Sequence, residues 1–281
     1  MTRRTLQLTL QYIFHDCFLL TTEEANVVFD FWQDPLPEKG ELPLFLRGLP
    51  KDKPLYVFVS HHHKDHYVKE IFDWNRDFPH IHYVLSHDTA KFARHILSPT
   101  STYAGTKPNP DSVTVLKPGE TYSDSLLTVK AYGSTDIGNS YALQIGGMSV
   151  FHAGDLNAWI WKDESTPEEV DQALKDFNVI LDDIAVDFQG FDIAMFPVDS
   201  RIGTDYFTGA QIFTRRLDVA RFFPMHFALG DTSEERLRHR LDAVKAAPCL
   251  TPREFIALQS PYSLFLRKRR AKKRGEESAL F

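Results

Sequence analysis

The sequence predicts a single layered α/β domain in which two β-sheets pack together and helices cover their outer faces. Apolar, β-rich segments come in runs, and helical patterns fall between and after these runs. The strands have an antiparallel look, and neither of the two Pro- and Gly-rich loops, at 34–54 and 98–111, is a clear interdomain linker. The 281 residues are enough for one domain with a sizeable core.

The first predicted strand covers residues 5–14. Gln7, Thr9 and Gln11 interrupt its apolar residues, so we expect a strand and not a signal peptide. Further strands are expected at 17–22, 26–31, 54–59, 81–86, 112–117, 126–132, 140–145, 148–152, 191–198 and 219–225.

Three helices are predicted between and after these strands. The clearest has capping-box spacing at Thr166 and Glu169, and Pro167 suits its first turn. Its apolar face repeats at steps of four and three residues, at Val170, Leu174, Phe177, Leu181 and Ile184. A second helix follows Asp88 and includes 92–97, and a third includes 237–244.

The composition is that of a globular protein, with 43% hydrophobic and 25% charged residues. No apolar run approaches the roughly 18 residues that span a bilayer. Cys17 and Cys249 are too few and too far apart for a disulfide framework or a cysteine zinc site. We therefore expect a cytoplasmic protein without a membrane partner.

The charge is unevenly distributed along the chain. Residues 267–281 contain seven of the 32 basic and two of the 38 acidic residues, so residues 1–266 carry a net charge of −11. We expect a single domain at 1–266 and a basic, disordered tail at 267–281, which could contact an anionic partner or a neighbouring subunit of a homo-oligomer. The acidic body makes nucleic acid an unfavourable partner.

Potential metal ligands follow the predicted strand at 54–59. Imidazole and carboxylate groups are ligands that zinc, iron and manganese share. Because alternate side chains at a strand end project to one side, His61 and His63 can bind one ion while His62 points elsewhere. Asp65 and His66 then turn into the next helix and can reach a second ion.

This H-x-H-x-D-H pattern after a strand resembles the signature of the metallo-β-lactamase superfamily of binuclear metal hydrolases. The resemblance implies an αββα four-layer sandwich with two divalent metal ions. The opening residues 14–30 are similar to the hairpin of the branch that includes ascorbate-phosphate lactonase-like proteins. In that pattern Asp30 takes the place of a buried carboxylate that supports the metal-binding loop, and His15 is a candidate partner of a ligand.

Two later segments extend the resemblance. Asp155, after Gly154, occupies the place of the aspartate that bridges the two ions, and His226 that of the histidine that completes the second site. Gly154 lets the backbone turn tightly, so that Asp155 can point into the site. The expected ligands are thus His61, His63, Asp65, His66, Asp155 and His226.

The third motif departs from the family. Ser134 stands where a third histidine is expected, and no histidine lies nearby in the sequence. A neutral serine is a weak ligand, so Asp136 is the candidate replacement; the alternatives are an incomplete first site, or an aspartate that only caps its turn. The sequence resembles a hydrolase-like subgroup with a Ser-Thr-Asp version of this motif. His152, three residues before Asp155, is a further candidate, although the odd spacing along its strand would turn it to the opposite face.

Two further residues are candidates for substrate binding. Trp159 could form an aromatic wall, although core packing explains a tryptophan equally well. Arg201 could hold a phosphate or carboxylate, or form a structural pair with Asp199.

The predicted function is metal-dependent hydrolysis of a small phosphoester, lactone or amide by a metal-bound hydroxide. Asp65 would bind one metal and orient the hydroxide or accept its proton. Zinc is the expected metal, with manganese or iron as alternatives. A nuclease or phosphodiesterase of the same fold, or a non-catalytic metal-binding scaffold, remain the alternative functions. The sequence contains no G-x-S-x-G, Walker or G-x-G-x-x-G motif that would favour other chemistry.

Overall fold

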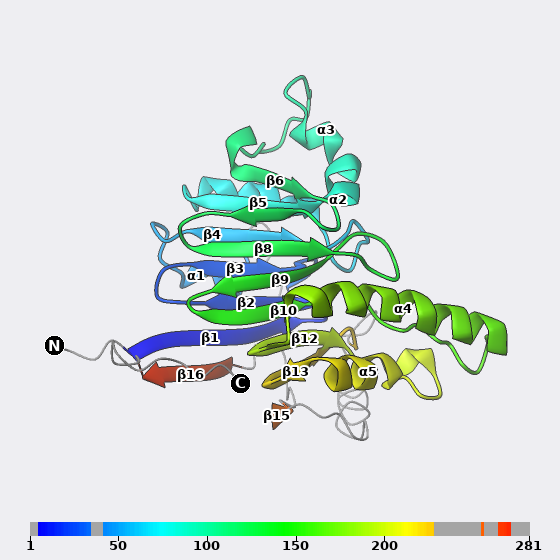
Figure 1. Cartoon of the computed structure of the whole chain (residues 1–281). Helices are drawn as coiled ribbons and strands as arrows, with labels where there is room; N and C mark the ends of the chain where they lie inside the picture. Colours follow the sequence, from blue (N-terminus) through cyan, green and yellow to red (C-terminus); the bar gives the residue numbers. More distant parts are fainter. Residues whose placement is uncertain (1–4, 35–41, 228–253, 256–263, 271–281) are drawn as a thin grey trace.

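The computed structural model describes residues 5–34, 42–227, 254–255 and 264–270, and they form two stacked β-sheets (Figure 1). The first sheet has the order β16 (Leu264–Arg270), β1 (Thr5–Phe14), β2 (Cys17–Thr21), β3 (Asn26–Phe29), β4 (Leu55–Val59), β5 (Ile81–Ser86) and β6 (Val113–Leu116). The second has the order β15 (Glu254–Phe255), β14 (Arg221–Met225), β12 (Ile193–Pro197), β10 (Met148–His152), β9 (Ser140–Ile145), β8 (Leu127–Tyr132) and β7 (Thr121–Ser123). Strands β11 (Gly190–Phe191) and β13 (Asp218–Val219) form a separate pair.

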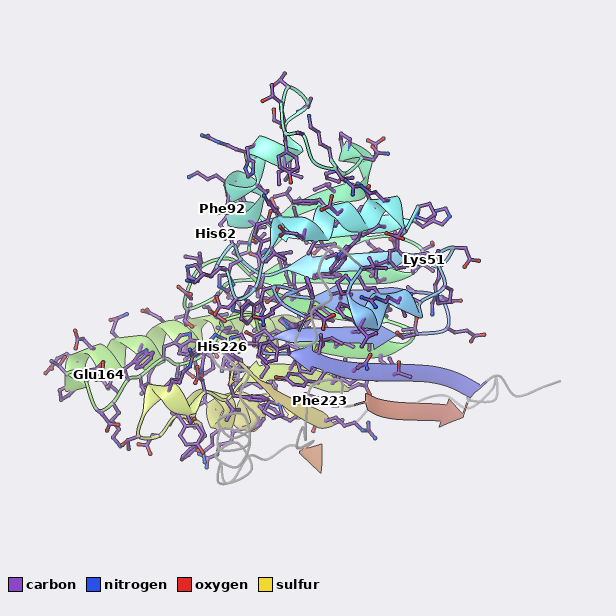
Figure 2. All side chains as sticks on the ribbon, turned by 180° about the vertical axis from the view of Figure 1, so that it is seen from behind. Lys51, His62, Phe92, Glu164, Phe223 and His226 are labelled. Carbon is purple, nitrogen blue, oxygen red and sulfur yellow. The ribbon has the colours of Figure 1, made fainter. Side chains whose placement is uncertain are left out.

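Helices cover the outer face of each sheet. Helix α4 (Pro167–Asp187) contacts β8, and α5 (Thr208–Arg216) contacts β12. On the other side, α1 (Leu44–Arg47), the 3₁₀ helix η1 (Lys69–Arg76), α2 (His87–Phe92) and α3 (Arg94–Leu97) accompany the first sheet, and Figure 2 shows α1 and η1 in front of its strands. Two short 3₁₀ turns, η2 (Pro110–Ser112) and η3 (Ser200–Ile202), complete the elements described. The predicted αββα sandwich is therefore confirmed.

Aromatic side chains fill the space between the two sheets. The Phe58 ring of β4 lies 5.3 Å from the Tyr141 ring of β9, and the Tyr141 hydroxyl donates a hydrogen bond to the Val59 carbonyl. Phe29 of β3 stacks on His152 of β10 at 4.8 Å. All four rings are fully or almost fully buried. None of the helices in the described part of the chain has the length and apolar character that a membrane span requires.

The two sheets are mixed, and the expectation of antiparallel strands is wrong for half of each sheet. Strands β3 to β6 run parallel, as do β10, β12, β14 and β15. Parallel neighbours need crossover connections, which η1, α4 and α5 supply. The carboxyl ends of these strands consequently meet at one edge of the sandwich.

The predicted strands all occur, with ends that differ by at most two residues, and the structure divides those predicted at 191–198 and 219–225 into β11 with β12 and β13 with β14. The capping box of α4 is also present: the Thr166 side chain accepts a hydrogen bond from the Glu169 N–H, and the Glu169 carboxylate accepts one from the Thr166 N–H at 2.8 Å. The apolar face of α4 is buried at Phe177, Leu181 and Ile184. Local patterns thus suffice to place these elements.

The helix predictions are less complete. The helix predicted after Asp88 consists of two short helices, α2 and α3, which break at Ala93, and its N-cap is Ser86. The predicted loop at 34–54 contains α1, and α5 was not expected because few large apolar residues mark its buried face. The helix predicted at 237–244 lies outside the described residues.

The predicted boundary of the basic tail needs a correction. Residues 267–270 belong to β16, which pairs antiparallel with β1 through partners such as Leu8 with Arg267 and Thr5 with Arg270. An edge strand pairs through its backbone and needs no apolar side chains, which is why a run of basic residues concealed it. Residues 271–281 lie outside the described part of the chain.

Because of this pairing, we expect removal of residues 267–281 to lower the stability of the fold. Deleting 267–281 removes four of the seven residue pairs between β1 and β16. At ~0.5–1.5 kcal/mol per hydrogen bond, we expect a loss of about 2 kcal/mol of folding free energy and a midpoint of thermal unfolding about 5 °C lower. Deletion of 271–281 is the matched control, because it leaves β16 in place. Equal midpoints for the two truncated proteins would contradict the β16 assignment.

Candidate metal centre

Histidine and aspartate side chains gather at the edge where the parallel strands end. In Figure 2, His62 and His226 lie at this edge and Lys51 at the opposite one. Two groups of possible metal ligands lie here, and in each group one nitrogen or oxygen atom per residue lies within 4.8 Å of the others. The first group is His61, His63, Asp136 and Asp155, and the second is His15, Asp16, His66 and His226.

Asp155 lies between the two groups. Its Oδ2 is 3.5 Å from His61 Nε2 in the first group. Its Oδ1 is 3.0 Å from His66 Nε2 and 3.3 Å from His226 Nε2 in the second group. One carboxylate thus presents an oxygen to each group, which is the arrangement needed to bridge two cations.

Asp30 orients the ligand loop after β4. Its Oδ1 accepts a hydrogen bond from the Ser60 N–H at 2.7 Å, and its Oδ2 lies 2.9 Å from His66 Nδ1. Although burial opposes ionisation, the hydrogen bond from His66 and the charges around it lower the pKa of Asp30. His66 therefore donates through Nδ1, and its Nε2 faces the second group. This is the supporting position in which the sequence predicted Asp30.

Asp199 orients the His226 imidazole as Asp30 orients that of His66. Its Oδ2 lies 2.9 Å from His226 Nδ1, and its carboxylate also accepts hydrogen bonds from the Arg201 guanidinium, with Nε at 2.8 Å. Despite its burial, the pKa of Asp199 is held well below its usual range by His226 and Arg201. The Asp199–Arg201 pair proposed from the sequence thus exists, and its role in orienting His226 was not predicted.

Two glycines allow three loops to meet at the site. Gly154 has φ +53°, and a Cβ there would lie 2.8 Å from Ser60 Cβ. Gly138 has φ +79°, and a Cβ there would lie 2.1 Å from the Ser60 carbonyl oxygen. That oxygen instead accepts a hydrogen bond from the Asn139 N–H at 2.9 Å. Both positions therefore require glycine. At Gly154 this agrees with the tight turn predicted before Asp155.

The loop at 133–139 brings Asp136, not Ser134, toward the first group. Asp136 Oδ2 lies 3.4 Å from His63 Nδ1. The Ser134 hydroxyl accepts a hydrogen bond from the Asp136 N–H at 3.2 Å, so serine shapes the turn. Burial and the charge of Asp155 raise the pKa of Asp136. This geometry favours Asp136 as the replacement for the missing histidine.

The two residues can be compared in one experiment. We expect Asp136→Ala to weaken metal binding at the first group by at least the ~10–100-fold that outer partners of metal ligands contribute. Ser134→Ala should have a smaller effect, because it removes only a turn hydrogen bond. Metal content after dialysis and turnover are the measurements. A larger loss in Ser134→Ala, or wild-type metal content in Asp136→Ala, would contradict the replacement.

The remaining predicted residues lie around the second group. Asp65 Oδ2 is 3.6 Å from His15 Nε2 and 3.9 Å from His66 Nε2, at the rim of the group. The structure places His15 inside the group itself, in ring contact with His226 at 4.5 Å. His152 faces away, as predicted, and its Nε2 is hydrogen-bonded to the Asp16 carbonyl at 2.9 Å.

Asp16 is the member of the groups that sequence reasoning missed. It lies in the turn between β1 and β2 and is fully buried. Its only sequence signal is the polar pair His15-Asp16 between two apolar strands. A single aspartate in a turn is ordinary, so this signal was too weak to use.

Four buried polar atoms where the two groups meet have no hydrogen-bond partner among the described residues: both carboxylate oxygens of Asp16, Nε2 of His66 and Oδ1 of Asp155. Burial raises the pKa of Asp16 to about 8. Although burial opposes it, the charges of Asp155 and Asp16 raise the pKa of His226 to about 9. Burying polar atoms without a partner costs free energy, and a bound divalent cation would provide a partner for these atoms. The residues present therefore fit metal ions.

A cavity of about 460 Å³ opens beside the two groups. Its lining includes Asp136, Asp155, Trp159, Trp161, Arg201 and His226. The Trp159 indole donates a hydrogen bond to the Asp155 carbonyl at 2.7 Å, and its ring lies 5.2 Å from that of His226. Both predicted substrate-binding residues, Trp159 and Arg201, thus line the cavity.

Comparison with known proteins agrees with this fold. Residues 9–173 match the family model described as the beta-lactamase superfamily domain, which is more than half of the chain. The chain belongs to the metallo-β-lactamase superfamily, whose members are mostly metal-dependent hydrolases. The ascorbate-phosphate lactonase-like branch remains a prediction. No curated protein sequence matches the chain.

Solved structures show the same fold at low sequence identity. Igni18, a metallo hydrolase of Ignicoccus hospitalis, has a TM-score of 0.61 and 15% identity over 93% of this chain and 98% of its own. YhfI of Bacillus subtilis, a metallo-β-lactamase fold protein, has a TM-score of 0.57 and 11% identity over 93% and 99%. CmlA of Streptomyces venezuelae, a diiron β-hydroxylase, has a TM-score of 0.55 and 13% identity over 96% of this chain and 55% of its own.

Proposed function

We propose that this protein is a metal-dependent hydrolase that acts on a small phosphoester, lactone or amide with two divalent ions, for which zinc is the first candidate. The position of Asp155 carries the proposal, because its two oxygens face two separate groups of ligands. The first ion would be held by His61, His63 and Asp136, and the second by Asp65, His66 and His226. Two bound cations acidify a water molecule and polarise the bond to be hydrolysed.

Asp65 is suited to orient that water. Its side chain is mostly buried at the rim of the second group, and its Oδ2 faces His15 Nε2 at 3.6 Å. Although burial opposes ionisation, the nearby imidazoles of His15 and His66 keep the pKa of Asp65 well below its usual range. A carboxylate of low pKa accepts a hydrogen bond well and retains a proton poorly. Asp65 therefore positions the water more than it stores its proton.

The cavity supports a small substrate. Its volume of about 460 Å³ matches a small organic molecule, and Trp159 offers a flat apolar wall. The Arg201 guanidinium lines the same cavity while Asp199 holds it in place. An anionic group of the substrate, such as a phosphate or carboxylate, would bind there.

The proposal can be tested with defined substrates. The protein is stripped with a chelator, reloaded with Zn²⁺ or Mn²⁺, and assayed on bis(p-nitrophenyl) phosphate, an aryl lactone and an anilide. We expect hydrolysis of at least one class that disappears on chelation and returns with metal. Asp124→Asn is a matched control. The Asp124 carboxylate accepts hydrogen bonds from the Tyr56 and Tyr122 hydroxyls outside both groups, so this variant should keep wild-type metal content and turnover.

Two results would contradict the proposal. Full metal loading without hydrolysis of any of the three classes would instead support a non-catalytic metal-binding scaffold. Failure of the wild-type protein to bind metal would remove the basis of both functions.

A further inference from the structure

The carboxyl group of Asp16 is buried at the centre of the second group and is not used by the mechanism above. The residue is fully buried, and neither of its carboxylate oxygens has a hydrogen-bond partner among the described residues. Its neighbours are imidazoles of the same group: Oδ2 lies 3.3 Å from Nε2 of both His15 and His66 and 4.0 Å from His226 Nε2. Asp16 therefore points into the space that these imidazoles enclose.

His66 and His226 cannot serve as hydrogen-bond donors to Asp16 while they act as ligands. Asp30 accepts the Nδ1 proton of His66, and Asp199 accepts that of His226. Each neutral imidazole then has a lone pair at Nε2, which faces the Asp16 carboxylate. A lone pair and a carboxylate oxygen repel each other at this distance unless a cation or proton lies between them.

The backbone of Asp16 is fixed relative to Asp155. The Gly154 N–H donates a hydrogen bond to His152 Nδ1 at 3.2 Å, so the protonated Nε2 of His152 donates to the Asp16 carbonyl at 2.9 Å. His152 thus connects the β1–β2 turn directly to the residue before Asp155. This link fits a carboxylate that must be placed accurately beside the other ligands.

We infer that Asp16 is a further ligand of the second metal ion, in addition to Asp65, His66, Asp155 and His226. The inference rests on the metal centre proposed above. The second site then offers three carboxylates and two imidazoles, whereas the first offers two of each. Carboxylates suit manganese, and imidazoles suit zinc as well as iron, so the second site favours Mn²⁺ or Fe²⁺ more than the first does.

The test is a titration of metal-free protein with MnCl₂ by isothermal titration calorimetry. The wild type is expected to bind two ions per chain. Asp16→Asn, which keeps the shape of the side chain, should bind one ion as before and the other about tenfold more weakly or not at all. Asp124→Asn serves as the matched control and should keep both ions.

Thermal unfolding separates a ligand from a structural residue. Metal-free Asp16→Asn should unfold at or above the wild-type midpoint, because it replaces a buried carboxyl group that has no hydrogen-bond partner among the described residues. Added MnCl₂ should raise its midpoint less than that of the wild type. If the asparagine protein does not fold, Asp16→Ala takes its place in both measurements.

The outcomes distinguish this inference from the proposed function. If the wild type and Asp16→Asn both bind two ions with the same affinities, Asp16 is not a ligand, and the metal centre itself stands. A wild type that binds no Mn²⁺, Zn²⁺ or Fe²⁺ overturns the metal centre itself.

Discussion

Replacing Asp155 by asparagine is expected to abolish most activity and to release at least one metal ion. The carboxylate offers one oxygen to each group, at 3.5 Å from His61 Nε2 and 3.0 Å from His66 Nε2. An amide keeps one oxygen but turns an NH₂ group, which is a donor, toward the other cation. Metal ions supply several kcal/mol of transition-state stabilisation, so we expect turnover to fall by about 10³-fold.

The fold should survive this change. Asp155 follows β10 in a loop, and its carboxylate faces the two ligand groups and not the apolar core. Circular dichroism and thermal unfolding of the metal-free proteins check this point. Wild-type turnover with both ions retained in Asp155→Asn would show that Asp155 is only a turn residue.

The second large effect is expected for His61→Ala and His63→Ala. The two imidazoles lie together, with His61 Nε2 3.1 Å from His63 Nδ1, and His61 is fully buried. Removing either leaves the first ion with too few donors, so we expect loss of that ion and of about 10³-fold in turnover. Metal analysis and turnover of the purified proteins test this directly.

The sequence provides a matched control between these two histidines. His62 turns away, stacks on Phe92 at 4.8 Å and lies 2.9 Å from Asp88 Oδ2 (Figure 2). His62→Ala should therefore retain both ions. If all three variants behave alike, the loss reflects a disturbed loop, and the assignment of His61 and His63 is wrong.

Much of the fold could be predicted because local patterns determine where strands occur. The alternation in β1 and the apolar run of β4 are visible in the sequence alone. Partners and directions of strands depend on contacts between distant segments, so the parallel halves of both sheets were not predicted. The pairing of β16 with β1 was not predicted either. It joins distant segments of the chain, and the basic residues 267–270 have no apolar pattern that would indicate a strand.

In the site, too, local patterns could be predicted from the sequence and long-range contacts could not. His61 to His66 form one compact pattern, and a tight turn marks Asp155, so these residues could be named from the sequence. Asp16 is 50 residues from His66 in the chain, and only the order β1-β2-β3-β4 brings the two together. The hydrogen bond of Asp199 to His226 likewise depends on the neighbouring position of β12 and β14.

Anomalous diffraction from crystals of the metal-loaded protein tests the central claim most directly. Data collected above and below the absorption edge of the added metal identify each ion by its element. We predict two peaks, one beside His61, His63 and Asp136 and the other beside His66 and His226, with Asp155 in contact with both. A single peak, or peaks that Asp155 does not touch, would contradict the binuclear centre.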